Sequence, residues 1–387
     1  MQVHELTDGG QSAEDVAGLI AEFMRPARRS LELALYDLRL PGRPGDIVAD
    51  ELREAAGRGV SVRLLYNIDS GRPHAIHPPP ATRPELLAEL PIDARPVPGQ
   101  PDLMHHKYAI RDREAVWSGS ANWTTDSWTR QENVVLTVGS ADLAAAYGAN
   151  FEELWERPDV ERSGRVEPRW VELAGGVRAR AWFTPGHGAE LSQAIASAIG
   201  SARRRVRIAS PVITSGPILA TLAELATGTE LDIAGVIDEP QSDAVFKQWE
   251  ANGNSTWKVP LLARALSALP FSGKRSTPWS PGTVHDFMHA KATVADDAVF
   301  VGSFNLSRSG EENAENVLEL RDADLAERLA AFVEAVRGRY PATSVPERAM
   351  ATISAGSSTM RASSRSAVEM RPGPSSSERI QASSPDQ

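Results

Sequence analysis

Two stretches of this chain repeat the same order of polar residues, and this internal repeat constrains the fold more than any other feature. Residues 104–133 read MHHKYAIRDREAVWSGSANWTTDSWTRQEN, and residues 288–316 read MHAKATVADDAVFVGSFNLSRSGEENAEN. With one single-residue deletion, nine positions match in order. The matched residues are Met104, His105, Lys107, Asp112, Gly119, Ser120, Asn122, Glu132 and Asn133 in the first copy, and Met288, His289, Lys291, Asp296, Gly302, Ser303, Asn305, Glu315 and Asn316 in the second. Self-similarity at this spacing predicts two copies of one folding unit.

Helical and strand patterns alternate around the repeated stretches. Apolar residues at helical spacing predict helices, and short apolar runs bounded by polar residues or glycine predict strands. Helices are expected over 13–24, 47–56 and 191–199, and strands over 30–38, 60–66 and 206–210. Such alternation is typical of an α/β fold with parallel strands and helices on both faces of each sheet.

The chain of 387 residues is long enough for two such units of about 150 residues each. The predicted organisation is an N-terminal repeat (1–157), a linker (158–180), a C-terminal repeat (181–343) and a disordered Ser-rich tail (344–387). The tail has 12 Ser, 4 Pro and no aromatic residue, so it cannot bury enough apolar surface to offset its ordering entropy. Residues 70–102 contain 9 of the 27 prolines, which predicts a functional loop without regular structure.

Composition excludes several classes of protein. Zero cysteines exclude disulfides, thiolate nucleophiles and cysteine-ligated metal sites. The net charge is −10 and no basic run is longer than residues 203–205, which weakens the case for a basic patch that binds nucleic acid or anionic lipid. No apolar run reaches the roughly 18 residues of a transmembrane helix, and the N-terminus lacks a signal-peptide pattern. We therefore expect a soluble, cytoplasmic protein.

Each copy of the repeat carries a histidine and a lysine two residues apart. The pairs are His105 with Lys107 and His289 with Lys291. In a strand, residues i and i+2 face the same side, so each imidazole and ammonium group project together. A turn and an apolar strand then lead to Gly-Ser-x-Asn, and this hairpin is expected to bring Asn122 and Asn305 back toward the histidines. Only five residues are lysine against 36 arginines, so two matched lysines favour a need for a compact point charge.

Two copies of H-x-K-x4-D followed by G-S-x-N resemble the phospholipase D superfamily of phosphodiesterases. The resemblance covers about residues 13–340, and both motifs are complete. It implies two tandem α/β/α sandwich repeats packed with pseudo-twofold symmetry, with one active site between them. It also implies cleavage at phosphorus through a phosphohistidine intermediate, without a metal or any other cofactor. Because one chain carries both motifs, no oligomer is needed to complete the site.

The resemblance also implies a role for each matched residue. One of His105 and His289 attacks phosphorus, and the other protonates the leaving alcohol and then activates water or an acceptor alcohol. Lysine and asparagine would clamp the non-bridging oxygens; these residues are Lys107, Lys291, Asn122 and Asn305. The glutamates Glu132 and Glu315 are expected to hydrogen-bond the imidazoles and fix their tautomers. The aspartates Asp112 and Asp296 are expected to organise their turns, and Ser120 and Ser303 to offer a hydroxyl at the bend.

The substrate class stays open at this point. A phospholipid headgroup is favoured over nucleic acid because of the net acidity, with hydrolysis or transphosphatidylation as the reaction. A nuclease or another phosphodiesterase is the alternative, and a non-catalytic binding protein on the same scaffold is a third. Loops 70–102 and 271–287 are expected to choose the substrate. Four tryptophans could line the site as an apolar rim or as stacking faces for bases, although core packing is the simpler interpretation; they are Trp123, Trp128, Trp257 and Trp279.

Two further interpretations concern the histidines. Those without a repeat partner are interpreted as structural or surface residues; they are His4, His74, His77, His106, His187 and His285. Of the two motif histidines, His105 is hypothesised to be the nucleophile. Arginines 111 and 113 flank its turn, whereas Asp296 and Asp297 occupy the other turn, and positive charge keeps an imidazole neutral.

Overall fold

The computed structural model describes residues 1–68, 82, 87–99, 102–253, 255–278, 280 and 282–353. The prediction of two α/β repeats is confirmed. The first sheet has the strand order β1-β9-β7-β6-β2-β4-β5, and the second has β10-β11-β17-β16-β15-β12-β13-β14. Apart from the additional edge strand β10, corresponding strands occupy the same seven places in both sheets.

The first sheet and its helices come from the N-terminal part of the chain. Its elements are β1 (Gln2–Leu6), α1 (Ala13–Met24), β2 (Ser30–Leu35), β3 (Leu38–Arg39), α2 (Arg43–Gly57), β4 (Ser61–Ile68), β5 (Asp93–Pro98), β6 (Lys107–Arg111), β7 (Ala115–Gly119), β8 (Trp123–Thr124), α4 (Thr125–Thr129), β9 (Asn133–Gly139) and α5 (Ala141–Glu156).

The second sheet and its helices follow. Its elements are η1 (Val160–Arg162), β10 (Val171–Glu172), η2 (Ala174–Gly176), β11 (Arg178–Phe183), α6 (Gly188–Ser201), β12 (Arg205–Ala209), α7 (Gly216–Leu225), β13 (Asp232–Asp238), α8 (Glu239–Asn252), η3 (Thr256–Lys258), α9 (Val259–Ala268), β14 (Phe271–Lys274), β15 (Ala292–Ala295), β16 (Ala298–Gly302), α10 (Arg308–Glu312), β17 (Asn316–Arg321) and α11 (Ala323–Arg337). Strand β11 begins at Arg178, inside the segment predicted as a linker.

Only part of each sheet is parallel, which differs from the simple βα alternation expected from the sequence. Strands β2, β4 and β5 run parallel, whereas β6, β7 and β9 form antiparallel pairs. The second sheet repeats this division, with β12, β13 and β14 parallel. The reason is the short connection within each motif, because strands joined by a tight turn must run antiparallel.

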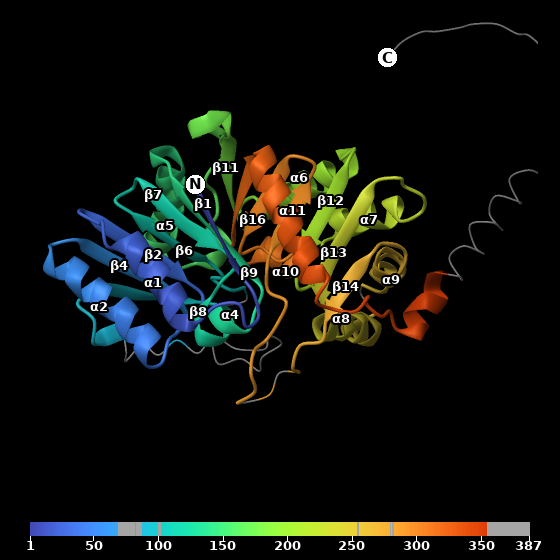
Figure 1. Cartoon of the computed structure of the whole chain (residues 1–387), viewed down its shortest axis with the longest axis horizontal. Helices are drawn as coiled ribbons and strands as arrows, with labels where there is room; N and C mark the ends of the chain where they lie inside the picture. The colour runs from blue at the N-terminus through green and yellow to red at the C-terminus, as the bar shows by residue number, and fades with distance from the viewer. Residues whose placement is uncertain are drawn as a thin grey trace, which may run out of the picture.

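The two repeats share one central core. Helices α5 and α11 contribute Phe151 and Phe332 to a single apolar cluster that also contains residues of both sheets, such as Ile110 and Val299. The outer face of the first sheet is covered by α1 and α2, and that of the second by α6, α7 and α9. Figure 1 shows this layering, with α1 and α2 at one end of the molecule and α7 and α9 at the other. The shared core fixes the position of one repeat against the other.

Two segments expected to be irregular contain regular structure. Strand β5 lies within the proline-rich stretch 70–102 and pairs with β4 at the edge of the sheet, where proline is tolerated because one side of the strand needs no ladder hydrogen bond. The predicted disorder from Ser344 onward also differs from the structure at residues 344–353. There Ala349 is buried against the second core and the Ser344 N–H donates to Glu239, because this stretch still has apolar residues to bury. Residues 354–387 lie outside the described part of the chain.

Candidate active site

The two histidine motifs meet where the repeats contact each other. The residue before each histidine forms an isolated parallel bridge with the opposite repeat: Met104 pairs with Ala314, and Met288 pairs with Glu132. The His105 N–H also donates to the Ala314 carbonyl at 2.9 Å. Each histidine motif therefore lies beside the end of the other copy, and both histidines belong to one site built from two repeats.

His105 is buried against a carboxylate from the second repeat. Its Nδ1 lies 2.8 Å and 2.9 Å from the two carboxylate oxygens of Glu315. The Tyr36 ring packs edge-on against the imidazole, with ring centroids 4.6 Å apart. Burial, together with the charges of Lys107 and Lys291, lowers the pKa of His105 well below its ordinary value. The imidazole is therefore neutral near pH 7, as a nitrogen nucleophile must be.

His289 faces an amide instead of a carboxylate. Its Nδ1 lies 3.0 Å from Asn133 Oδ1. Burial lowers its pKa well below the ordinary value, and the charges of Lys291 and Lys107 and the proximity of His105 add to this effect. These mutual influences place the two imidazoles and the two ammonium groups within one electrostatic environment.

Each lysine is fixed to the backbone of its own motif. Lys107 Nζ donates to the His105 carbonyl at 2.7 Å, and Lys291 Nζ donates to the His289 carbonyl at 2.6 Å. Burial lowers the pKa of Lys107 to about 7, against the opposing effect of the Glu315 carboxylate. Burial and the charge of Lys107 lower the pKa of Lys291 as well. Two buried cations with depressed pKa values favour an anionic ligand, because a negative charge would stabilise both.

The Gly-Ser-x-Asn bends contribute to the site across the repeats. The backbone of Ser303 hydrogen-bonds the histidine of the first repeat, and the backbone of Ser120 hydrogen-bonds that of the second. Each serine hydroxyl stays within its own copy, where it accepts from a backbone N–H. Two residues further on, Asn122 Oδ1 and Asn305 Oδ1 are buried and have no hydrogen-bond partner among the described residues. Each of these amides therefore has an atom left to hydrogen-bond with a bound polar group.

The motif aspartates bind backbone N–H groups at the far end of the hairpins. Asp112 accepts from residues 28, 29 and 30 at 2.7–3.1 Å, and Asp296 accepts from residues 203, 204 and 205 at 2.8–3.1 Å. Burial raises both pKa values, but these hydrogen bonds outweigh it, so the pKa of each aspartate is lowered. Both residues therefore tie the motif turn to the neighbouring strand, which is the organising role expected for them.

The expectation that Glu132 hydrogen-bonds His289 is wrong. Glu132 is fully buried at the isolated bridge just before β9, where it contacts Lys274 Nζ at 2.9 Å and the Tyr340 hydroxyl. Its neighbour Asn133 faces the imidazole instead, because the bridge across the repeats is offset by one residue. Sequence reasoning missed both Asn133 and Lys274. The signals were present, since Asn133 is one of the nine matched positions and Lys274 is one of only five lysines.

No other described histidine belongs to the two His–Lys pairs. His106 is fully buried, its Nδ1 faces Asn316 Oδ1 at 3.2 Å, and burial lowers its pKa to about 3. His187 pairs with Glu190. His285 stacks on Phe287, and its Nδ1 lies 3.8 Å from Asp126 Oδ2. His74 and His77 lie outside the described residues.

The tryptophans form no aromatic rim in the described part of the chain. Trp123 and Trp128 are 1% and 0% exposed. Both belong to the core of the first repeat, where their large apolar side chains pack against other apolar residues. Trp257 is 57% exposed. Trp279 lies outside the described residues. Core packing, the simpler interpretation, therefore holds for two of the four.

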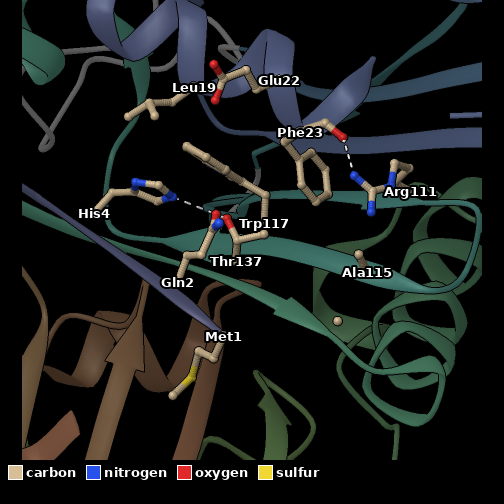
Figure 2. Close-up of a pocket in the computed structure, with 11 residues that line it drawn as sticks. Met1, Gln2, His4, Leu19, Glu22, Phe23, Arg111, Ala115, Trp117 and Thr137 are labelled. Carbon is tan, nitrogen blue, oxygen red and sulfur yellow. Dashed lines mark hydrogen bonds between the residues drawn. The ribbon is translucent and has the colours of Figure 1, made fainter. Parts of the chain in front are cut away.

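A cavity of about 400 Å³ lies away from these groups, between α1 and the first sheet. Figure 2 shows Trp117 at its centre, with Phe23 beside it and His4 stacked on the indole ring. Arg111, at the opposite end of β6 from Lys107, also lines it. In the described residues no group of three or more metal-ligating side chains suits a metal ion.

No described helix is both long and apolar enough to cross a membrane.

Comparison with known sequences identifies relatives of this chain. Mitochondrial cardiolipin hydrolase of Xenopus laevis is 29% identical over 133 residues, covering 34% of this chain and 58% of that protein. The protein of the same name from Homo sapiens is 29% identical over 167 residues, covering 40% of this chain and 60% of the relative. Cardiolipin synthase A of Escherichia coli O157:H7 is 24% identical over 346 residues, covering 82% of this chain and 66% of that protein. The chain spans less than two thirds of the length of each of these relatives.

Solved structures and a family model agree on the fold. Phosphatidylserine synthase of Haemophilus influenzae Rd KW20 superposes with a TM-score of 0.60 at 16% identity and covers 95% of both chains. Polyphosphate kinase of Porphyromonas gingivalis gives a TM-score of 0.53 at 13% identity, covering 93% of this chain and 56% of the other. The family model described as cardiolipin synthase, PLD-like domain, matches residues 20–155 and 195–336, one match for each repeat. This chain therefore belongs to the phospholipase D superfamily, as its two motifs predicted.

Proposed function

We propose that this protein is a phosphodiesterase that cleaves phospholipids through a phosphohistidine intermediate. The observation that carries the proposal is the meeting of His105 and His289 with Lys107 and Lys291 in one site between the repeats. A two-step displacement at phosphorus requires one neutral imidazole as the nucleophile, one imidazolium as the proton donor and positive charge beside the phosphate oxygens, and two imidazoles and two buried ammonium groups can supply these.

In the first step one imidazole Nε2 bonds to phosphorus as the bond to the leaving alcohol breaks. The other imidazole, protonated on both nitrogens once the anionic phosphate is bound beside it, gives its Nε2 proton to the leaving oxygen. In the second step that imidazole takes a proton from water or from an acceptor alcohol, the new oxygen bonds to phosphorus, and the nitrogen–phosphorus bond breaks. Water gives hydrolysis, and an alcohol gives transphosphatidylation. Both reactions share the same first step.

The positive charge in this mechanism comes from the protein. The ammonium groups of Lys107 and Lys291 would pair with the non-bridging oxygens, and the amides of Asn122 and Asn305 would donate to them. Because these groups stabilise the transition-state charge, we propose that turnover needs no divalent ion. One chain supplies both motifs, so we also propose that a monomer is sufficient.

The choice of phospholipid over nucleic acid rests on the relatives and on charge. The relatives are described as cardiolipin hydrolase and cardiolipin synthase, and the family model as cardiolipin synthase, PLD-like domain. The chain has a net charge of −10, which repels a polyanion more than a single phosphodiester headgroup.

The test is a parallel turnover assay on phospholipid vesicles and single-stranded DNA, each with and without EDTA. We expect phospholipid turnover that survives EDTA and is lost in His289→Ala. The matched control is His187→Ala, because that histidine pairs with Glu190 outside the site and its loss should leave turnover unchanged. Cleavage of DNA alone would favour the nuclease alternative, and activity that disappears in EDTA and returns with Mg²⁺ would refute the metal-independent mechanism.

A further inference from the structure

The two catalytic histidines differ in the residue that faces Nδ1, and the cause is a one-residue offset between the repeats. In the sequence alignment Ala314 corresponds to Gln131. However, Met104 bridges Ala314 whereas Met288 bridges Glu132, one position later. In an extended segment a shift of one residue turns every side chain to the opposite face. His105 therefore faces Glu315, and His289 faces an amide.

The amide of Asn133 has one orientation only. Its Nδ2 donates to the Ser127 carbonyl at 2.9 Å and contacts the Ser127 hydroxyl at 3.2 Å. Its Oδ1 accepts from the Ser120 hydroxyl at 2.7 Å and faces His289 Nδ1 at 3.0 Å. Because an amide oxygen can only accept, Nδ1 of His289 must carry the hydrogen. The Nε2 atom is the one left for proton exchange with substrate.

The displaced glutamate is held by a cation that the first repeat lacks. Glu132 and Lys274 are 0% and 4% exposed at the side chain, and their charged groups lie 2.9 Å apart. Tyr340 donates to the other carboxylate oxygen of Glu132. In the second sheet Lys274 on β14 pairs with Asp238 on β13. In the first sheet Val97 on β5 pairs with Asn67 on β4. Asp238 and Asn67 correspond, because each accepts from the N–H of the methionine before a motif histidine.

This ion pair stabilises the offset. Breaking it would leave an unpaired charge in the protein interior, which costs several kcal/mol in comparable buried pairs. Lys274 therefore keeps Glu132 on the face away from His289. In the first repeat Val97 occupies the corresponding place, so no lysine faces the equivalent glutamate, Glu315, from that strand, and Glu315 reaches His105.

We infer that Asn133 is a positioning residue that makes His289 the proton donor and leaves His105, supported by Glu315, as the nucleophile, with Lys274 and Tyr340 keeping Glu132 away. The inference rests on the proposed phosphodiesterase function. A carboxylate on Nδ1 increases the electron density and basicity of the other ring nitrogen, which favours attack on phosphorus. A neutral amide orients the ring without that effect, so the imidazolium that forms beside the anionic phosphate gives up its proton more readily.

The decisive experiment exchanges the two partners. Wild-type protein is mixed with ³²P-labelled phosphatidylglycerol in micelles, quenched, and mapped by peptide, and we expect the label on the peptide that contains His105. In the double variant Glu315→Gln/Asn133→Asp the carboxylate faces His289 instead, and we expect most of the label to move to the His289 peptide. Label on His289 in the wild type, or label that stays on His105 in the double variant, would overturn the inference.

A second readout does not depend on turnover. With ¹⁵N-labelled histidine, the ring nitrogen shifts of His289 follow its protonation in a pH titration. We expect the pKa of His289 to rise in Asn133→Asp, because a carboxylate stabilises the imidazolium, and an unchanged pKa would contradict the inference. If no protein is labelled by phospholipid but this pKa rises, the proposed function fails while the unequal environment of the two rings stands.

The role of Lys274 is tested in the same spectra. We expect Lys274→Met to change the ring nitrogen shifts of His289, because Glu132 loses its cation. Lys274 donates to the Arg130 carbonyl at 2.9 Å, and Lys258 donates to the Thr214 carbonyl at 2.8 Å. Lys258→Met is the matched control, because Lys258 lies outside the site. Unchanged His289 shifts in Lys274→Met would remove Lys274 from the inference.

Discussion

Glu315 and His105 are 210 positions apart in the chain, yet a carboxylate oxygen of Glu315 lies 2.8 Å from His105 Nδ1. This contact crosses from the second repeat to the first. It completes the surroundings of one histidine with a group from the other repeat, so neither repeat alone contains the whole site. It also distinguishes His105 from His289, which faces an amide.

The first prediction removes the charge from this contact. Glu315→Gln should lower kcat by about 100-fold, within the usual contribution of acid–base groups, while KM changes little because Glu315 lies behind the imidazole. The amide is isosteric, so the fold should persist. Steady-state kinetics on phospholipid micelles checks this, with Glu312→Gln as control because Glu312 pairs with Arg308 outside the site. Equal losses in both variants would refute a specific role for Glu315.

The second prediction concerns pH. Burial raises the pKa of Glu315 to about 7 and lowers that of Lys107 to about 7. As pH falls below this value Glu315 gains a proton and no longer supports His105, and as pH rises above it Lys107 loses its charge. The pH profile of kcat/KM should therefore be a bell with its maximum near pH 7. In Glu315→Gln the acidic limb should disappear. A flat profile between pH 5 and 9 would contradict this assignment.

The fold and most of the site could be predicted from the sequence because the repeated residues are polar, and polar residues recur in order only when their surroundings recur. The helix predicted over 13–24 matches α1, with its Ser12 capping box. The offset that places Asn133 beside His289 could not be predicted. It depends on the packing of two repeats against each other, and the aligned sequences imply symmetric partners.

The packing of side chains also explains why the charges in the motif turns do not distinguish His105 from His289. The sequence suggested that Arg111 and Arg113 act on His105. In the structure Arg111 donates to the Phe23 carbonyl and Arg113 pairs with Glu32 and Glu152. Arg113 is therefore paired with carboxylates and Arg111 with a backbone carbonyl, both at the end of the hairpin away from Lys107. The charges that lower the pKa of His105 are those of Lys107 and Lys291.

The third prediction is about stability. Asp112→Asn should lower the free energy of unfolding at pH 7 by about 2 kcal/mol, because one oxygen that accepts backbone N–H groups becomes a donor. The left-handed conformation of residue 112, with φ 55°, suits asparagine. Because the pKa of Asp112 is lowered in the folded state, its contribution is present above the unfolded pKa of about 4 and is lost as pH falls through the lower folded value.

Urea unfolding measured at pH 7 and at acidic pH checks this prediction. The difference between wild type and Asp112→Asn should shrink as the pH falls below about 4. Asp297→Asn is the matched control in the corresponding turn, since Asp297 is exposed and pairs with Arg204 at the surface. Its loss should change stability by less than about 1 kcal/mol. A difference for Asp112→Asn that does not depend on pH would contradict the assigned role.

The fourth prediction asks whether charge alone is sufficient at the lysine positions. Lys107 is 1% exposed, donates to the His105 carbonyl at 2.7 Å and lies 4.9 Å from the centre of the Tyr36 ring. Arginine keeps the charge, but its planar guanidinium is wider and does not fit this space without displacing His105. Lys107→Arg should therefore reduce kcat by about 100-fold or more. Lys247→Arg on the exposed side of α8 is the control and should have no effect. If Lys107→Arg retained wild-type kcat and kept its activity above pH 8, a fixed positive charge would be sufficient, and the requirement for a compact ammonium group would be refuted.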